Sequence, residues 1–311
     1  MRQARPAKQW KPGQEMRRAA LLFIAPAAIL WIWWFAYPAI RSLILSFYDY
    51  NYIRTAGNQF VGLANYAKLF TDRTFKQSFW HSCQMVLVCV PVQTCLSLLF
   101  AVLLDTEFRG RSVIRTIFYA PYVISAIAVA TVFMYLYGQD APLTNLFSAL
   151  FGLENKGWFA NMKLALPLVM IMFVWQQTGF YMIMYLAGLD SIPSELNEAA
   201  EIDGANRLQL FFHITRPMLR PTTYLVVTYG IITAFQVFDQ MSAIAGTGVL
   251  GSPGGALNTM VTFFYQNSFK YGKVGYGSAA VVVLFILIFT ITLLQRMFVE
   301  RENRKGGGGE A

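Results

Sequence analysis

The sequence has little charge: 13% of its 311 residues are Asp, Glu, Lys or Arg, whereas soluble globular domains carry about 25%. The two histidines, His81 and His213, are too few and too far apart in the chain for an obvious metal site. No G-x-x-x-x-G-K-[ST] sequence occurs, so the chain has no phosphate-binding loop of its own. No nucleophile–base pair is indicated either. We therefore expect no catalytic residues, no metal and no cofactor in this chain.

Cysteine is scarce, which excludes a disulfide scaffold. The three cysteines are Cys83, Cys89 and Cys95, each six residues from the next. Steps of six turn an α-helix backwards by about 120°, so the three thiols should point in different directions. We interpret them as small residues buried in the membrane, and not as a metal or redox site.

Hydrophobic residues make up 56% of the chain, and aromatic residues 16%. They fill long stretches between charged residues, and a bilayer-spanning helix needs about 20 such residues. Six stretches qualify. A seventh, between Asp239 and Lys270, is rich in glycine, whose bare backbone would lack hydrogen bonds against lipid. We predict an all-α integral membrane protein with spans at about 19–40, 79–104, 115–137, 164–189, 221–244 and 277–297, the glycine-rich loop following a fifth span that runs past Asp239.

Lys and Arg are distributed unevenly about these spans. With the N-terminus in the cytoplasm, 16 of them fall in inside segments and 9 in outside segments. Because cytoplasmic loops carry an excess of Lys and Arg, both termini are predicted to lie inside. Much of the net charge of +9 is then a topology signal, which argues against nucleic-acid binding. We divide the chain into a cytoplasmic tail (1–18), a transmembrane domain (19–300) and a flexible C-terminal tail (301–311).

The cytoplasmic segment 190–217, between spans four and five, predicts two short helices. Pro193 suits a first helical turn, and the acidic residues that follow favour the N-terminal region of that helix. Gly204 can take the left-handed conformation that ends it. Asn206 then caps a second helix, with Gln209 in the capping-box position. The first helix carries Glu195, Glu198 and Glu201, and the second carries an apolar face of Leu208, Phe211 and Phe212.

Such a segment fits a surface that docks into another protein. The alternative is an amphipathic loop that rests on lipid headgroups. Helices that lie on membranes are usually basic, whereas the first of these is acidic, which favours docking.

The same segment resembles the EAA motif of membrane-spanning subunits of bacterial ABC importers. The matching residues are Glu198, Ala199, Ala200, Gly204, Ile214 and Pro217. Arg216 departs from the motif, which usually has leucine there. The resemblance implies that Glu198, Ala199, Ala200, Asp203, Gly204, Ile214 and Pro217 belong to a loop that couples the permease to an ATPase.

Further patches are similar to the carbohydrate-uptake class, and within it to the first of two dissimilar permeases of the maltose type. They are Ala25-Pro26, Tyr37-Pro38, Phe60–Tyr66, Phe118–Pro121, Gly254-Gly255 with Thr259, and Gly275–Ala279. The resemblance implies a multi-pass protein of the bacterial cytoplasmic membrane. It also implies a complex with a second permease, two ATPase subunits that use ATP and Mg²⁺, and an extracytoplasmic sugar-binding protein.

Sugar recognition needs hydrogen-bonding groups and aromatic faces. By resemblance, spans four and five line the sugar pathway, and they offer Gln176, Gln177, Phe180, Tyr229, Thr233, Gln236 and Asp239. For Gln176 and Gln177, hydrogen bonding between helices is the alternative role. Asp239 is a charge within a predicted span, which by default indicates a functional role. Because Asp239 is near the outer end of that span, where water is close, an interfacial or packing carboxylate is favoured over a pathway role. Trp175 fits an interfacial packing residue better.

Two other functions stay open at this level. A permease for another solute, such as a polyamine or phosphate, would keep the docking loop but should lose the carbohydrate-class patches. A channel or a membrane enzyme would not require an EAA loop, and neither a ring of pathway charges nor a catalytic cluster is present in the sequence.

Overall fold

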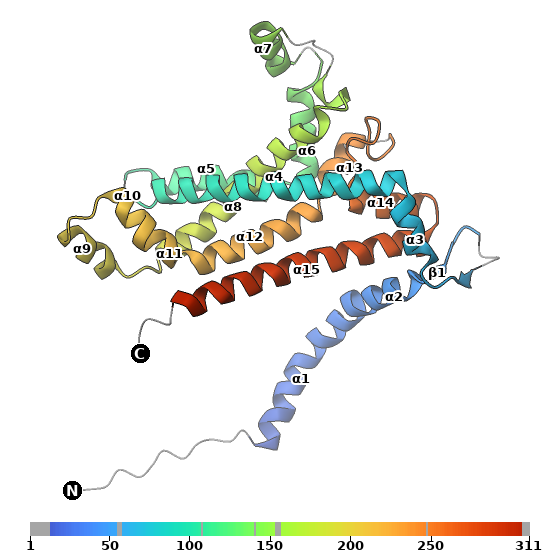
Figure 1. Cartoon of the computed structure of the whole chain (residues 1–311), viewed down its shortest axis with the longest axis horizontal. Helices are drawn as coiled ribbons and strands as arrows, with labels where there is room; N and C mark the ends of the chain where they lie inside the picture. The colour runs from blue at the N-terminus through green and yellow to red at the C-terminus, as the bar shows by residue number, and fades with distance from the viewer. Residues whose placement is uncertain are drawn as a thin grey trace.

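A bundle of long helices forms the body of the protein. The computed structural model describes residues 13–54, 58–106, 108–139, 141–152, 157–246 and 248–306. Figure 1 shows four long helices running side by side, with α5 lying along one edge. The four are α4 (Arg73–Leu103), α8 (Ala165–Leu189), α12 (Arg220–Phe235) and α15 (Val274–Gly306), and α5 spans Arg111–Val123.

Helix α8 is the centre of this bundle. In its most apolar window 61% of the residues are buried, against 33% in α4 and 28% in α15. A helix that is apolar on all sides is expected to be surrounded by other helices. Its largest fully buried side chains are Met172, Met182, Phe173, Tyr181 and Tyr185. Packing around α8 therefore fixes where its polar side chains sit.

The first membrane helix stands away from the bundle. It consists of α1 (Gln14–Trp31), a π-helical turn η1 (Ile32–Ala36) and α2 (Tyr37–Leu45). None of its most apolar window is buried. Figure 1 shows α1 leaving the bundle, while α2 lies against α15. This helix is long enough to span a membrane, and within the described chain its contact with the bundle is made by α2.

Short elements close the end of the bundle opposite α9. A two-residue antiparallel ladder pairs β1 (Tyr48–Asp49) with β2 (Gln59–Phe60), and α3 follows at Ala64–Thr71. Asn65 donates through Nδ2 to the carbonyl oxygens of Ser46 and Tyr48, both at 2.9 Å. These bonds tie α3 to the end of the first membrane helix.

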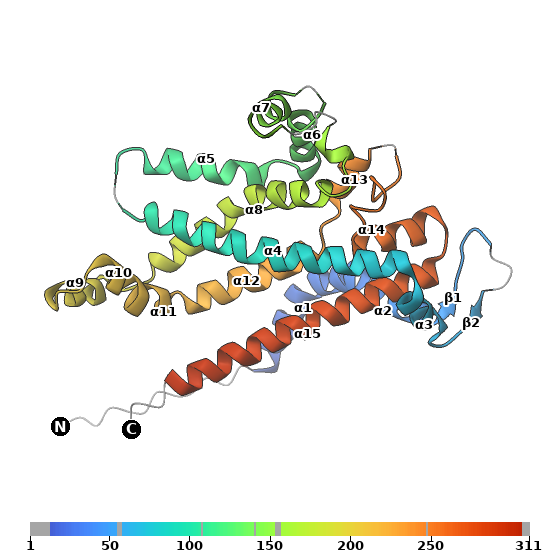
Figure 2. The ribbon, with the colours of Figure 1, turned by 45° about the horizontal axis from the view of Figure 1, so that its top comes forward.

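The third predicted span, 115–137, is not one straight helix. It is α5 followed by α6 (Ala126–Leu136), and the two are bent by 97°. At the break, Ile124 is extended, and its carbonyl oxygen accepts a hydrogen bond from Gln176 Nε2 at 3.1 Å. Figure 2 shows α6 and α7 (Pro142–Phe151) standing beyond the bundle, and the short helix η2 (Trp158–Ala160) leads back to α8. The hydropathy pattern predicted the extent of this apolar segment, but it carried no information about the bend.

The fifth predicted span is also interrupted. Helix α12 ends at Phe235, and α13 (Asp239–Ala245) begins after a three-residue break, so the span does run past Asp239 as expected. The glycine-rich loop that follows is irregular, with Gly251, Gly254 and Gly255 at positive φ. Residue 247 lies outside the described residues. The loop leads to α14 (Met260–Tyr265) and a π-helical turn η4 (Gln266–Lys270).

Among the described residues, five helices are long and apolar enough to cross a membrane, and the bent pair α5–α6 makes a sixth candidate. Helix α1 begins at Gln14, within the predicted tail 1–18, and residues 1–12 of that tail lie outside the described residues. Helix α15 continues to Gly306, and 307–311 of the predicted C-terminal tail are likewise not described.

The approach of α5 to α8 depends on Gly179. A Cβ atom at this position would collide with the Phe118 carbonyl oxygen. We expect Gly179→Ala to force α5 outward and to destabilise the fold by about 1–3 kcal/mol, as overpacking does. Thermal unfolding in detergent should show a lower midpoint. Ala187→Val, on the exposed side of the same helix, should leave the midpoint nearly unchanged; equal midpoints for both variants would contradict this account.

Candidate functional site

The segment after α8 forms the two short helices that the sequence predicts. Helix α9 spans Ser194–Ile202, and Gly204 follows with φ of +78°. The backbone N–H of Ala205 donates to the Ala200 carbonyl at 2.9 Å, which closes the end of the helix. A left-handed residue at this position is the usual helix terminator, and glycine adopts it without steric cost. The elbow predicted at Gly204 is confirmed.

The second helix starts at the predicted cap. Asn206 accepts through Oδ1 from the Gln209 backbone N–H at 2.9 Å, and Gln209 Oε1 accepts from the Asn206 N–H at 2.8 Å. This reciprocal pair satisfies two backbone donors that the helix itself leaves free. Helix α10 (Arg207–Leu210), the π-helical turn η3 (Phe211–Thr215) and α11 (Arg216–Met218) then lead into α12.

The resulting elbow, residues 194–218, protrudes from one end of the bundle (Figure 1). Its base is anchored by Leu219, which is 1% exposed in a cluster with Tyr185 and Leu189. Three motif residues are half-buried: Ile214 and Pro217 near this base, and Ala200 on α9. The other four are exposed, namely Glu198, Ala199, Asp203 and Gly204.

Large apolar side chains on the elbow face outward as well. Ile202 is 87% exposed and Leu208 is 70% exposed. Phe212 is exposed and Phe211 half-buried, so the predicted apolar face is present. Sequence reasoning missed Ile202, although its place beside Asp203 at the end of an acidic helix was a usable signal. The elbow thus presents acidic and apolar side chains together, an arrangement suited to docking into a complementary cleft.

The residues predicted on spans four and five fall into two groups. Gln176 is buried, and both ends of its amide are engaged: Nε2 donates to Ile124, and Oε1 accepts from Gln240 Nε2 at 3.1 Å. This amide joins α8 to the α5–α6 break and to α13. Gln176 therefore makes hydrogen bonds between helices, which is the alternative role considered for it in the sequence analysis. Gln240 was missed, although a glutamine beside Asp239 within a span is itself a signal.

The second group begins on α12 with Tyr229 and Thr233 and continues beyond its end with Gln236, in the break, and Asp239, at the start of α13. We call these four residues together the polar face of α12. Tyr229, Gln236 and Asp239 are exposed, and Thr233 is half-buried. The Thr233 hydroxyl donates to the Tyr229 carbonyl at 3.0 Å and lies 3.1 Å from the Tyr181 hydroxyl. The spacing of 229 and 233 puts Tyr229 and Thr233 on one side of α12.

Aromatic rings border the polar face. Phe180 lies 5.5 Å from the Tyr229 ring and stacks on Tyr122 at 4.4 Å, with the two planes 12° apart. Sequence reasoning missed Tyr122 because it lies on α5, at the end next to the break. Gln177 is half-buried, and its Oε1 has no hydrogen-bond partner among the described residues. Phe180, Tyr229 and Thr233 are thus brought together, and Gln236 and Asp239 extend the same side of the chain.

No metal-binding geometry was found in the part of the chain that the structure describes. The three cysteines are free: Cys83 is half-buried, Cys89 buried and Cys95 exposed. Their different surroundings agree with the prediction that they point in different directions. The expected burial holds for Cys89 and partly for Cys83, whereas Cys95 lies on the surface of this chain.

Known proteins resemble the chain over most of its length. A family described as "binding-protein-dependent transport system inner membrane component" matches residues 93–304. The sulfoquinovosyl glycerol transport system permease protein SmoG of Agrobacterium fabrum is 30% identical over 287 residues, covering 92% of each chain. The arabinooligosaccharides transport system permease protein AraP of Bacillus subtilis is 31% identical over 280 residues, covering 89% of this chain and 87% of AraP.

The fold has a solved counterpart. A chain of a bacterial alginate ABC transporter, in complex with an alginate pentasaccharide-bound periplasmic protein, superposes with a TM-score of 0.78 at 22% identity, covering 93% of this chain and 96% of that one. The trehalose/maltose permease protein MalF of Thermococcus litoralis is 33% identical over 235 residues, covering 76% of this chain and 78% of MalF. The chain belongs to the family of inner membrane components of binding-protein-dependent transport systems.

Proposed function

We propose that the chain is a permease subunit of an ABC importer for sugars and forms half of the translocation pathway, with the polar face of α12 as its wall. Relatives that act in oligosaccharide and sugar-derivative transport systems support the substrate class. The observation that carries the pathway is the exposure of Tyr229, Gln236 and Asp239 along the α12–α13 segment, which is one candidate membrane span.

The membrane environment makes this exposure informative. Tyr229 lies nine residues beyond Arg220, about 14 Å along α12, close to the middle of a hydrocarbon core about 30 Å thick. Polar side chains at such depth are costly against lipid and normally face a water-filled cavity or another helix. A wall that combines aromatic rings with amide, hydroxyl and carboxylate groups suits sugars, which offer apolar ring faces and many hydroxyls.

The elbow 194–218 is proposed as the site where ATP hydrolysis in another subunit drives the pathway. The sequence has no phosphate-binding loop, so free energy must come from partner chains that bind ATP and Mg²⁺. Glu198, Ala199, Ala200, Asp203 and Gly204 would sit in a cleft of the ATPase, with Ile214 and Pro217 carrying its movement to α12. Because Leu219 anchors the elbow in the bundle, displacement of the elbow would move the pathway wall directly.

The proposed assembly contains a second permease, two ATPase subunits and an extracytoplasmic sugar-binding protein. The exposed α1 and the exposed polar face both favour a second permease beside this chain. In the proposed topology α5–α6 counts as one of six spans, and the elbow and both termini lie in the cytoplasm, as the distribution of Lys and Arg favours.

The pathway wall is tested with the reconstituted complex. We expect Tyr229→Ala and Thr233→Val to reduce sugar-stimulated ATP hydrolysis at least about tenfold, while subunit assembly stays normal, because each removes a contact to the sugar. A panel of sugars should be used, since the chain does not name its substrate. Tyr135→Ala, exposed on α6, is the control and should behave as wild type. Full activity of both wall variants would contradict the pathway, and no response to any sugar would contradict the substrate class.

The elbow is tested by glycine and charge substitutions. Gly204→Val places a β-branched residue at positive φ, which costs about 1 kcal/mol or more and misaims the second helix. Glu198→Lys reverses a charge on the same elbow. Each of these two single variants should weaken ATPase co-purification and abolish transport, while membrane levels stay normal. Gly152→Val is the matched control, because Gly152 has φ of +65° and open space but lies far from the elbow in sequence. Asp49→Lys, exposed on β1 away from the elbow, controls for charge reversal. Normal uptake in both elbow variants would contradict coupling.

The topology is tested by labelling in intact cells. In a chain without its native cysteines, Ser252→Cys should react with a membrane-impermeant thiol reagent, because the glycine-rich loop is placed outside. Ser194→Cys, at the start of α9, should react only after the membrane is opened. Labelling of position 194 from outside would reverse the proposed orientation.

A further inference from the structure

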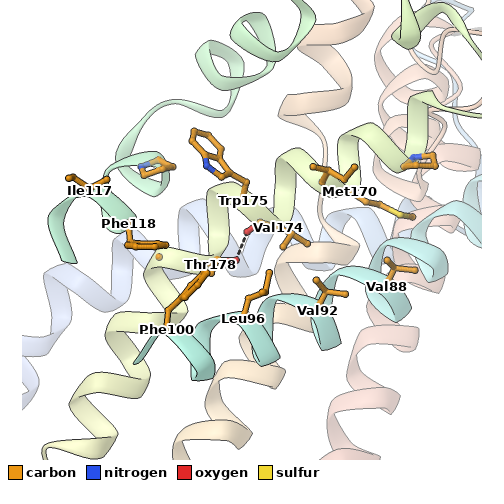
Figure 3. Close-up of a pocket in the computed structure, with 14 residues that line it drawn as sticks. Val88, Val92, Leu96, Phe100, Ile117, Phe118, Met170, Val174, Trp175 and Thr178 are labelled. Atoms are coloured by element: carbon orange, nitrogen blue, oxygen red, sulfur yellow. Dashed lines mark hydrogen bonds between the residues drawn. The ribbon is translucent and has the colours of Figure 1, made fainter. Parts of the chain in front are cut away.

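An apolar groove of about 750 Å³ lies between α4, α5 and α8, away from the polar face. Figure 3 shows Val88, Val92, Leu96 and Phe100 along one side of α4, with Phe118 at one end and Trp175 across from them on α8. The lining hydroxyl, on Thr178, donates to the Val174 carbonyl of its own helix at 2.6 Å. Apart from the indole N–H of Trp175, the lining is apolar, and the groove suits a hydrocarbon occupant.

The length and openness of the groove fit an acyl chain. Val88 to Phe100 covers thirteen residues of α4, about 18 Å along the helix. Val88 and Val92 are 46% and 43% exposed, so the groove opens sideways to the surroundings of the bundle. In the proposed topology α4 spans the membrane, so a side of the groove that the second permease leaves uncovered meets lipid, and water gains little in a groove so poor in hydrogen-bonding groups.

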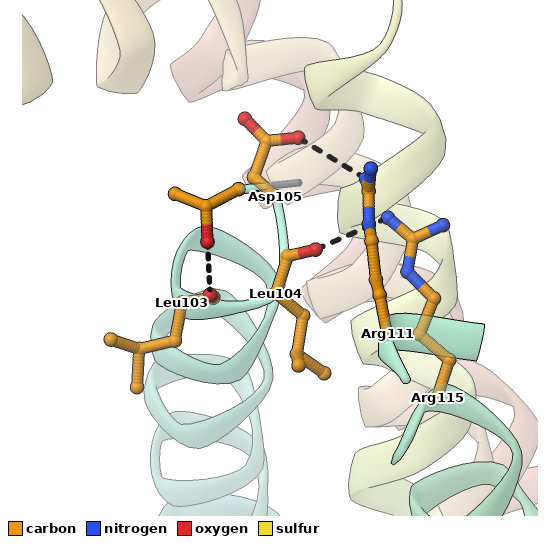
Figure 4. Close-up of polar contacts among 6 residues, drawn as sticks. Leu103, Leu104, Asp105, Arg111 and Arg115 are labelled. Atoms are coloured by element: carbon orange, nitrogen blue, oxygen red, sulfur yellow. Dashed lines mark hydrogen bonds and ion pairs between the residues drawn. The ribbon is translucent and has the colours of Figure 1, made fainter. Parts of the chain in front are cut away.

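Arginines lie just beyond one end of the groove. The rings of Phe100 and Phe118 meet at 4.7 Å, and Leu104 lies one turn further along α4. Its carbonyl oxygen accepts from Arg115 Nη2 at 3.3 Å. Arg111, Arg115 and Phe118 are spaced by four and three residues, so they share one face of α5. The basic side chains thus continue the line of the groove toward the end of the bundle that carries the elbow (Figures 1 and 4).

These arginines have unused donor capacity. Arg111 Nη2 lies 3.8 Å from Asp105 Oδ1, a long ion pair (Figure 4). The Nε atoms of both residues are buried and unpaired among the described residues, so the Nη atoms are the donors that a phosphate could reach from outside. Burial raises the pKa of Asp105, a shift that Arg111 opposes and the nearby Asp190 reinforces. Two arginine forks beside so poor a counter-ion match the bidentate geometry that a phosphate group accepts.

We propose that an anionic phospholipid binds here, with one acyl chain in the groove and its phosphate at Arg111 and Arg115. Basic pockets between membrane helices at the headgroup level are a recurring form of lipid recognition. The bound chain would fill the space between α4, α5 and α8 and hold α5 in place. The C-terminal end of α5 carries Tyr122, which stacks on Phe180 at the pathway wall, so the lipid would also support that wall.

The test compares lipids retained by the purified transporter assembly. After equilibration with equal amounts of phosphatidylglycerol and phosphatidylcholine, native mass spectrometry should find phosphatidylglycerol bound to the wild type in preference. The double variant Arg111→Gln, Arg115→Gln should lose that preference by about tenfold, since both phosphate contacts disappear. Arg115→Lys should retain most of it because the charge is kept. Arg73→Gln, exposed at the other end of α4, should have no effect.

The groove is tested separately by a variant and a matched control on the same helix. Val92→Trp fills the groove and should reduce retention of phosphatidylglycerol by a similar factor. Leu99→Trp, which is 52% exposed on α4 but does not line the groove, should not. Equal retention of both lipids by the wild type, or unchanged retention in both Val92→Trp and the arginine variant, would overturn the proposal. Because Val92 makes no polar contact, this arm stands even if the arginine variant fails to fold.

Discussion

The interior of a membrane offers no water to hydrogen-bond with polar groups, and the rest of the structure depends on this constraint. A polar side chain at that depth needs a partner, so its partner reveals its role. Gln176 uses its amide to join three segments, including the Ile124 carbonyl that the α5–α6 break leaves free. The polar face of α12 instead leaves Tyr229, Gln236 and Asp239 exposed, and this difference separates a packing role from a proposed pathway role.

The elbow and the pathway wall belong to one mechanical unit. Helix α12 begins where the elbow ends, and Leu219 is buried between them against α8. In the proposed coupling, movement at the exposed end would be transmitted through these packed side chains, which shift together as a rigid body and do not deform one by one. The proposed lipid acts on the opposite side of α8, through α5. In this account α8 is the fixed element, with α12 and α5 adjustable on either side of it.

Local chemistry was predictable from sequence, and long-range geometry was not. Pro193, Gly204, Asn206 and Gln209 fixed the helix ends of the elbow, because caps and positive φ are decided by neighbouring residues. The 97° bend depends on a distant glutamine and on packing, neither of which hydropathy reports. The same limit applies to Tyr122: its contact with Phe180 joins residues far apart in the chain. The coupling and sugar-contact roles of the predicted residues remain predictions.

Thiol accessibility in the assembled transporter tests the central claim, that the polar face of α12 lines a sugar pathway. Gln236→Cys should react with a small hydrophilic thiol reagent, and a transported sugar should slow that reaction. Leu99→Cys, on the apolar surface of α4, should stay unreactive because it faces lipid. A Gln236→Cys variant that is unreactive, or whose reaction no transported sugar slows, would contradict the account.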